Sequence, residues 1–320
     1  MLIAASATLV GLAALAWSAD RFVEGAAAVA RYLGMAPLLV GMLIIGFGTS
    51  APELVVSAFA AAGGAPEIAF GNALGSNIAN IGLILGVTAL LSPVLVHKGV
   101  LRKEMPVLLG VTALAAALML DKELSRVDAV VLVVLLLALI AWSIRQSRSA
   151  PDDALAGDVE AEVVAHHLSR RAAWTWLVAG LFLLVISSRV LVWGAVGIAE
   201  RLGWSDLIIG LTVVAIGTSA PELASSIAAA RKGENDLALG NIIGSNLFNT
   251  LGVIGLAGLI APAAVSPELI TRDLPVVFGL TAALVVFAVW PLARGRVSRI
   301  EAGLLLLAFC GYMGALLVFA

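Results

Sequence analysis

The chain has 320 residues, of which 61% are hydrophobic and 12% are charged, about half the charged fraction of an average soluble domain. Its net charge of -2 and pI of about 5.9 exclude the strongly basic surface that nucleic-acid binding requires. A mean hydropathy of +1.08 places the chain among integral membrane proteins, with the lipid bilayer as the solvent for nearly all of it.

Ten hydrophobic segments follow one another along the chain, each long enough to cross a bilayer as an α-helix. They lie near residues 2–30, 36–62, 67–92, 100–120, 125–144, 173–200, 206–230, 237–261, 270–293 and 298–319. The first segment has no basic n-region, so we interpret it as a retained span rather than a cleaved signal. The predicted fold class is an all-α membrane protein with ten transmembrane helices and no separate soluble domain.

The basic residues of the loops predict the orientation of these spans, because cytoplasmic loops are enriched in Lys and Arg. With the N-terminus outside, thirteen of them face the cytoplasm: Arg31, Lys98, Arg102, Lys103, Arg145, Arg148, Arg170, Arg171, Arg231, Lys232, Arg294, Arg296 and Arg299. Only Lys122, Arg126, Arg201 and Arg272 lie on the other side. We therefore expect a protein of the cell's inner (plasma) membrane with both termini outside and a cytoplasmic linker at 146–171. That linker lacks the ligand spacing of an EF-hand, which makes a cation-sensing role the weaker interpretation.

The heptapeptide "GTSAPEL" occurs twice, at Gly48–Leu54 and at Gly217–Leu223, 169 residues apart. The same offset aligns the two copies without a gap from Asp20 to Gly86, so the chain contains a duplication. The first repeat covers 1–145, with its motif region at 46–86, and the second covers 172–320, with its motif region at 215–255. Five spans in each copy predict an inverted repeat, as in secondary transporters, whose substrate sites lie at interrupted helices near the bilayer midplane.

Each heptapeptide can present three oxygen-bearing side chains on one helical face. These are Thr49, Ser50 and Glu53 in the first copy and Thr218, Ser219 and Glu222 in the second. Pro52 and Pro221 should bend their helices and free backbone carbonyls. An ionised carboxylate at the bilayer centre costs at least about 2.5 kcal/mol, and no Lys or Arg is expected at the depth of either glutamate. We therefore expect the two carboxylates to hold exchangeable cations or protons.

A second duplicated element follows each heptapeptide, "GNALGSNIANIGLILG" from Gly71 and "GNIIGSNLFNTLGVIG" from Gly240. It places Ser76 with Asn80, and Ser245 with Asn249, one helical turn apart on one face. Hydroxyl, amide, carbonyl and carboxylate oxygens suit Ca2+, which takes six to eight oxygen ligands, and also Na+. For any one Ser or Asn, helix–helix hydrogen bonding is the alternative, and we assign Asn77 and Asn246 to packing or to such bonding.

The paired motifs, with "RKGENDLALGNIIGSN", resemble the α-repeats of prokaryotic sodium/calcium exchangers of the cation/calcium antiporter superfamily. The resemblance implies a secondary-active antiporter that exchanges Na+ for Ca2+ by alternating access, with the ions as substrates, no cofactor and no enzymatic activity. It implies the cation ligands Thr49, Ser50, Glu53, Ser76, Asn80, Thr218, Ser219, Glu222, Ser245 and Asn249, with the backbone carbonyls of Gly46 and Ala215 for Na+.

One position departs from the family pattern, since well-studied exchangers often have an acid where this chain has Asn249. The site would then carry two formal negative charges, enough to balance one Ca2+. "GTSAPE" in place of a "GNAxE" type of motif favours Na+ over H+ as the coupling ion, and an H+/Ca2+ or other divalent cation antiporter remains the alternative. A channel or an intramembrane hydrolase fits less well. Stoichiometry, K+ dependence and oligomeric state stay open, with a monomer as the simplest expectation, and the first and sixth spans are the predicted sliding elements.

Overall fold

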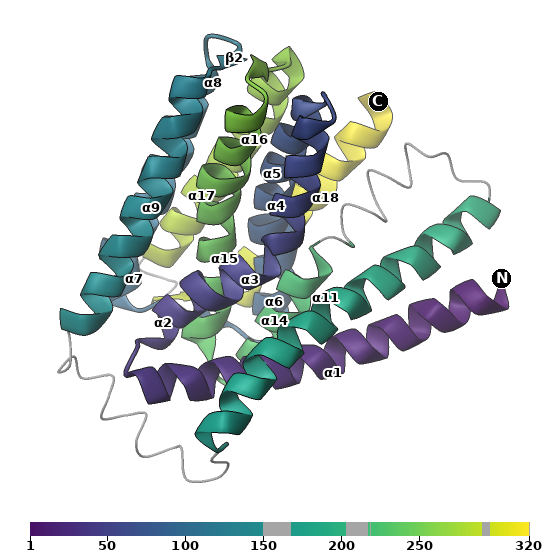
Figure 1. Ribbon diagram of the computed structural model, residues 1–320, viewed down its shortest axis with the longest axis vertical. Coiled ribbons are helices and arrows are strands. Elements are labelled where there is room, and N and C mark those ends of the chain that lie inside the picture. The colour runs from purple at the N-terminus through teal and green to yellow at the C-terminus, as the bar shows by residue number, and fades with distance from the viewer. Residues whose placement is uncertain (150–167, 203–216, 218, 290–294, 320) are drawn as a thin grey trace.

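The computed structural model describes residues 1–149, 168–202, 217, 219–289 and 295–319 (Figure 1). In the first half the elements are α1 (Leu2–Leu33), α2 (Pro37–Val40), the π-helix η1 (Gly41–Gly46), α3 (Phe47–Thr49), α4 (Ala51–Ala62), α5 (Pro66–Ile78), the π-helix η2 (Ala79–Leu85), α6 (Gly86–Leu91), β1 (Val94–Leu95), α7 (Lys98–Arg102), α8 (Glu104–Met119), β2 (Glu123–Leu124) and α9 (Arg126–Ser149).

The described elements of the second half begin after the predicted linker. They are α11 (Arg170–Arg201), α14 (Ala220–Arg231), α15 (Asn235–Phe248), the π-helix η4 (Asn249–Val253), α16 (Ile254–Ile260), β3 (Ala263–Ala264), the π-helix η5 (Leu269–Asp273), α17 (Leu274–Val289), β4 (Arg296–Val297) and α18 (Arg299–Phe319). Residues 150–167, which make up most of the predicted linker, lie outside the described part of the chain.

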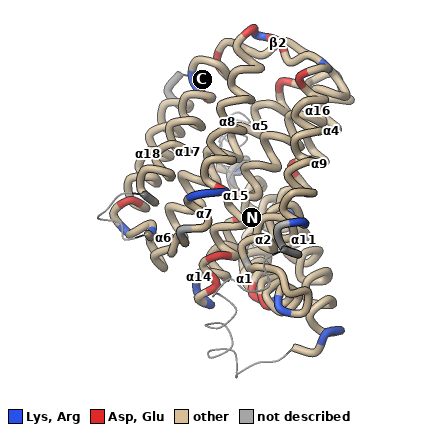
Figure 2. The backbone as a smooth tube through the Cα atoms, turned by 90° about the vertical axis from the view of Figure 1, so that its left-hand side faces the viewer, with Lys and Arg blue, Asp and Glu red and all other residues tan. Residues whose placement is uncertain are grey.

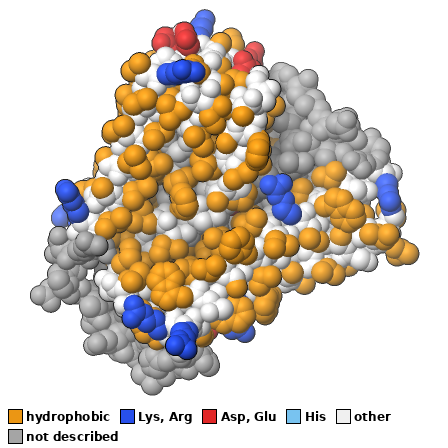
Figure 3. Space-filling model, in the orientation of Figure 1, with side chains coloured by type: hydrophobic (Ala, Val, Ile, Leu, Met, Phe, Trp, Pro, Cys, Tyr) orange, Lys and Arg blue, Asp and Glu red, His pale blue; other side chains and the backbone are white. Residues whose placement is uncertain are grey.

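Seven described helical segments are long and apolar enough to cross a membrane, and a bent pair, Leu38–Thr49 with Ala51–Ala62, makes eight. The two other predicted spans correspond to α8, which has 16 residues, and to a segment that ends in α14 and is otherwise mostly outside the described residues. The all-α membrane fold is therefore confirmed, and the count of ten helices stays a prediction. Figure 2 shows the charged residues mainly near the ends of the helices, and Figure 3 shows hydrophobic side chains over most of the visible face of the bundle.

Two short antiparallel ribbons each join one half of the chain to the other. β1 pairs with β4, and β2 pairs with β3. The Val96 N–H donates to the Gly295 carbonyl over 2.7 Å, and the Val265 N–H donates to the Lys122 carbonyl over 2.8 Å. β1 and β3 begin 169 residues apart, the offset of the two heptapeptides. Because α8 runs from the β1 end of the bundle to β2, the ribbons lie at opposite ends, as a duplication in opposite orientations would place them.

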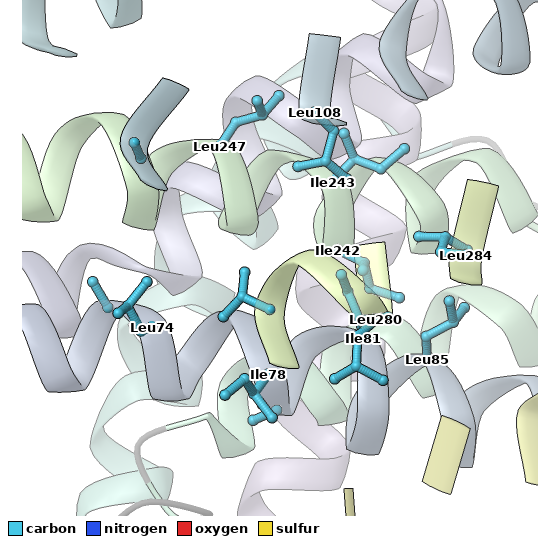
Figure 4. Packing of buried hydrophobic residues seen from close by; sticks show 14 of the residues in the cluster. Leu74, Ile78, Ile81, Leu85, Leu108, Ile242, Ile243, Leu247, Leu280 and Leu284 are labelled. Carbon is cyan, nitrogen blue, oxygen red and sulfur yellow. The ribbon is translucent and has the colours of Figure 1, made fainter. Parts of the chain in front are cut away.

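A hydrophobic core forms where α5 and η2 face α15, with α8 and α17 closing it (Figure 4). Its labelled side chains are Leu74, Ile78, Ile81, Leu85, Leu108, Ile242, Ile243, Leu247, Leu280 and Leu284. These residues are at most 5% exposed. The duplicated elements that carry the polar motifs are thus held face to face by apolar contacts, which stabilises a polar cluster that would be costly in lipid by itself.

α1 and α11 form a separate pair that crosses the bundle obliquely (Figure 1). Glycines let their backbones approach closely. A Cβ at Gly25 would lie 2.5 Å from the backbone nitrogen of Leu177, and one at Gly194 would lie 2.6 Å from that of Thr8. The two contacts are equivalent under the 169-residue offset, because Gly25 aligns with Gly194 and Thr8 aligns with Leu177. The pair contains the first and sixth predicted spans, and its sliding stays a prediction.

Candidate cation-binding site

A helix begins directly after the serine of each heptapeptide, with the proline as its second residue. Ser50 has φ -85° and ψ 1° between α3 and α4, and the segments on either side are bent by 44°. Ser219 has φ -88° and ψ 8° at the start of α14. Each proline therefore lies in the first turn of the new helix, where its missing N–H has no helical partner to lose. The bend predicted for the first motif is confirmed, with the break at Ser50 in the turn that precedes Pro52. For the second motif it stays a prediction, because the residues before Ser219 lie mostly outside the described part of the chain.

Each glutamate lies in the first turn after the break and is buried, with Glu53 2% and Glu222 3% exposed. A helix N-terminus carries free N–H groups and the positive end of the helix dipole, both of which stabilise a carboxylate. The serine break therefore gives each buried acid a favourable backbone environment that does not depend on an ion pair. Among the described residues, neither glutamate forms an ion pair with Lys or Arg.

Three π-helical segments adjoin the site. η1 directly precedes α3, η2 begins one residue before Asn80, and η4 begins at Asn249. A π-turn shifts hydrogen bonds from i+4 to i+5, which changes the direction of side chains and carbonyls, and such turns are frequent at functional sites. The sequence analysis did not predict these segments, because the hydrophobic pattern of a π-turn does not differ visibly from that of an α-helix.

One hydrogen bond joins the two heptapeptides directly, and a second joins the two halves beside them. The Ser50 hydroxyl donates to Oε1 of Glu222 over 3.1 Å, and the Ser245 hydroxyl donates to the Gly46 carbonyl over 3.3 Å. The Thr49 hydroxyl donates to the Ile45 carbonyl over 3.0 Å. The structure thus brings together Gly46, Thr49, Ser50, Glu222 and Ser245, five of the predicted ligands, from both halves of the chain.

Several buried oxygens of the same cluster accept no hydrogen bond within the described part of the chain. They are both carboxylate oxygens of Glu53, Oε2 of Glu222, and the amide oxygens of Asn77, Asn80 and Asn249. A buried acceptor without a donor is costly, and a buried charge is more so. Carboxylate and amide oxygens of this kind are the ligands that a hard cation prefers.

Of the four remaining predicted ligands, the structure describes two. Ser76 and Ser219 are buried, 6% and 2% exposed. Thr218 and the Ala215 carbonyl lie outside the described residues. No three His, Cys, Asp or Glu side chains come together in the described ranges, so the oxygens beside the two glutamates are hydroxyl, amide and carbonyl groups.

Asn77 and Asn246, assigned from the sequence to helix–helix bonding, each form a hydrogen bond between the halves. Asn77 Nδ2 donates to the Thr250 hydroxyl over 2.8 Å, and Asn80 Nδ2 donates to Oδ1 of Asn246 over 3.0 Å. The amide of Asn80 is thereby held so that its oxygen is left without a donor. Asn246 consequently positions a predicted ligand.

Asn241 aligns with Asn72 at the 169-residue offset, and no role was predicted for it. Its Nδ2 carries two hydrogens and lies 2.8 Å from the Ser226 hydroxyl, 3.1 Å from the Ser225 hydroxyl and 3.1 Å from the Glu222 carbonyl. Its Oδ1 lies 3.2 Å from the Thr49 hydroxyl, which donates its one hydrogen either to this oxygen or to the Ile45 carbonyl. The spacing Asn241, Ser245, Asn249 repeats every four residues, so the one-face argument used for the last two could have included the first.

Comparisons with known proteins give matches that cover nearly the whole chain. The family model described as "Sodium/calcium exchanger protein" matches residues 3–145 and 172–318. The putative antiporter CaxA of Alkalimonas amylolytica is 45% identical over 98% of both chains, and the inner membrane protein YrbG of Escherichia coli (strain K12) is 41% identical over 85% of both. A solved structure of the sodium-calcium exchanger NCX_Mj soaked with Na+ and Ca2+ is 30% identical, with a TM-score of 0.85 over 99% of both chains.

Proposed function

The chain belongs to the sodium/calcium exchanger family, a family of transporters rather than enzymes, and from this premise we propose that it exchanges Na+ for Ca2+ across the membrane. The observation that carries the proposal is the buried cluster around Glu53 and Glu222. Its carboxylate oxygens are mostly without donors among the described residues, and it is assembled from both halves of the chain.

Charge balance explains why such a site would carry out antiport. Two carboxylates balance one Ca2+ or two Na+, and an unbalanced site would leave a net charge in a region of low dielectric constant. The site would change its accessible side only when one ion type or the other neutralises it. Because both ions use the same oxygens, the binding of one excludes the other, and the exchange is coupled.

The proposed cation ligands are those that the resemblance implies. They are Thr49, Ser50, Glu53, Ser76, Asn80, Thr218, Ser219, Glu222, Ser245 and Asn249, with the carbonyls of Gly46 and Ala215. The donor-free oxygens of Glu53, Asn80, Glu222 and Asn249 support four of these assignments. Asn249 supplies a neutral oxygen, so the site holds two formal charges rather than three.

The proposed architecture is two inverted repeats of five helices, ten helices in all. Support comes from the two ribbons that join the halves at opposite ends and from the reciprocal glycine contacts of α1 and α11. We place the protein in the inner membrane, with both termini outside and residues 146–171 in the cytoplasm. The distribution of Lys and Arg supports this orientation.

Proton coupling is the second candidate, and one observation favours it. A buried carboxylate without a donor is relieved by protonation as well as by a cation. The same two glutamates would then carry protons when Ca2+ leaves. The two candidates differ in the ion that drives uptake, not in the residues used.

The test is uptake of radiolabelled Ca2+ into proteoliposomes loaded with Na+, with K+-loaded and acid-loaded vesicles as references. Wild type is compared with the double variant Glu53→Gln/Glu222→Gln. Glu67→Gln is the matched control, because Glu67 also follows Ala-Pro in the first turn of a helix but is exposed.

Uptake that requires internal Na+, is lost in the double variant and persists in Glu67→Gln supports sodium/calcium exchange at the paired motifs. Uptake driven equally by a proton gradient without Na+ would replace the sodium assignment with the proton antiporter. Uptake that survives loss of both carboxylates would remove the proposed site.

A further inference from the structure

The short turn between α14 and α15 carries charged side chains that face α1 of the other half. Lys232 Nζ donates to the backbone carbonyl of Asp20 over 2.8 Å and lies 4.0 Å from its carboxylate. Burial raises the pKa of the Glu234 carboxyl in the same turn, and the positive charge of Arg31, in the last turn of α1, opposes that rise. Figure 2 shows charged residues of both signs where α14 meets α1.

The other side of the same turn is bound to the core of the bundle. His97 Nδ1 lies 2.8 Å from Oδ1 of Asp236, in the first turn of α15. His97 follows Val96, whose N–H donates to the Gly295 carbonyl next to the β1–β4 ribbon, and most of α15 is buried in the hydrophobic core. The turn is therefore fixed to the core, and Lys232 connects α1 to the turn.

The apolar contact between α1 and α14 does little to fix the position of α1 along its own axis. α14 contributes four buried residues to the cluster that it shares with α1, and all four are alanines: Ala220, Ala228, Ala229 and Ala230. Alanine side chains are too short to form the ridges that interlock packed helices. A directional bond at the edge of this contact therefore has a large influence on where α1 lies.

The sequence allows this bond on one side of the molecule only. At the 169-residue offset the counterparts of Lys232 and Glu234 are Gly63 and Ala65, and the counterpart of His97 is Ser266. None of these three residues carries a charge. The turn between α4 and α5 therefore has no side chains that could hold α11 as the turn between α14 and α15 holds α1.

We propose that Lys232 is a positioning residue for the exchange reaction, whose bond to Asp20 fixes α1 along α14 in this state and breaks each time the cation site changes its accessible side. A displacement of α1 by one helical turn, about 5.4 Å, separates the two residues. The proposal rests on the proposed function, because only a protein that alternates between two states must release α1.

The first test fixes the contact covalently. In a Cys310→Ser background, which removes the one cysteine of the chain, Asp20→Cys and Lys232→Cys are joined by a bifunctional methanethiosulfonate with a short spacer. The matched control joins His97→Cys and Asp236→Cys, a pair that also connects the two halves but lies on the core side of the turn. The 20–232 cross-link should abolish Ca2+ uptake into proteoliposomes, and its reduction should restore uptake. The 97–236 cross-link should leave at least half of the uptake rate.

Three results of this test would overturn the proposal. Uptake that continues with residues 20 and 232 joined would show that α1 does not leave Lys232 during exchange. A 20–232 pair that does not cross-link would show that the contact is not populated. An equal loss of uptake in both cross-linked proteins would show that the turn itself moves against the core.

The second test measures the position of α1 without transport. Spin labels on Ala16→Cys and Arg231→Cys, two exposed positions, report the distance between α1 and the end of α14 in the Cys310→Ser protein. Lys232→Met should raise the ratio of displaced to bound α1 about twofold to fivefold, the effect of one exposed charged contact. Lys232→Arg keeps the charge and a donor, so it should restore the wild-type distances.

Unchanged distances in Lys232→Met, or a change that Lys232→Arg does not reverse, would overturn the proposal. Because the distance measurement needs no transported ion, failure of sodium/calcium exchange in the uptake experiment is distinguishable from failure of this contact. If a proton gradient drives uptake instead, the cross-linking test uses that gradient with the same expected results.

Discussion

α5 and α15 carry the same pattern, glycine-asparagine followed by "GSN", yet they have different surroundings. The glycines of α15 touch the backbone of α2 and η1, whereas Gly71 and Gly75 of α5 have no described atom within contact distance. Gly71, Asn72 and Gly75 are half-buried, whereas Gly240, Asn241 and Gly244 are buried. The counterparts of α2 and η1, residues 206–215, lie outside the described part of the chain. The glycine pattern therefore permits a close helix contact, and the elements that face it decide whether that contact forms.

Replacing the glutamates gives the largest expected effect. Glu53→Gln and Glu222→Gln should each reduce Ca2+ affinity more than a hundredfold, because breaking a buried charge contact costs about 3–5 kcal/mol. Ser50 donates to Glu222, whereas Glu53 has no donor among the described residues. Comparison of the two variants therefore shows whether a neighbouring hydroxyl reduces the loss of Ca2+ affinity. The affinity of each variant is measured as Ca2+ binding to the purified protein. An effect below tenfold would place that carboxylate outside the site.

The glycines of α5 and α15 test the comparison directly. Gly244→Ala adds a Cβ against the backbone of Met42 and should destabilise this state by up to about 3 kcal/mol. Gly75→Ala, its counterpart, should be neutral or stabilising, because alanine favours a helix by about 1 kcal/mol over glycine. Thermal unfolding in detergent measures both. Gly75→Ala should still slow transport, because the added Cβ would prevent α5 from packing as closely as α15 does in this structure. A normal turnover rate would contradict this equivalence of the two helices.

The glycines of α1 and α11 provide the symmetric reference. Gly25→Ala and Gly194→Ala each press a Cβ into the backbone of the other helix, at 2.5 Å and 2.6 Å. Overpacking of this kind costs about 1–3 kcal/mol, and we expect the lower end because the pair is partly exposed and can separate slightly. The two variants should lose equal stability in thermal unfolding. A clear difference between the two losses of stability would show that α1 and α11, like α5 and α15, differ in how closely they are packed.

One hydrogen bond between α11 and the second motif gives the smallest expected effect. The Ser188 hydroxyl donates to the Gly217 carbonyl over 2.8 Å, and its counterpart in α1 is Ala19. Ser188→Ala should cost about 0.5–1.5 kcal/mol and change the rate of exchange more than the affinity, since the bond joins a predicted sliding helix to the core. Parallel measurement of turnover and KM checks this, and a change in KM alone would assign Ser188 to the cation site.

Much of the fold and the site was predictable from residue pattern. The hydrophobic runs located the spans to within a few residues in the described part of the chain, because a helix in lipid must be apolar over its whole length. The four-residue spacing of Ser245 and Asn249 predicted one shared helical face, and both side chains are buried in the structure. Buried carboxylates in lipid are rare and costly, which made Glu53 and Glu222 recognisable without a structure.

Other features depended on contacts between distant segments. The break at Ser50 rather than at Pro52, the π-helices and the role of Asn241 left no clear signal in the hydrophobic pattern. Asn241 matters because it meets Thr49, 192 positions earlier, and no local spacing encodes that meeting. Asn72 shows the same limit, since it is partly exposed whereas its counterpart Asn241 is buried.

The sequence by itself determined the membrane class, the duplication, the family resemblance and the pair of acids, because burial in lipid restricts composition, and a repeated motif preserves its spacing. Only the tertiary structure decided which oxygens lack donors, which hydroxyl crosses to which glutamate, and how closely α15 packs against η1. The physical reason is that the two halves have nearly the same local preferences, so their difference arises from the contact between them.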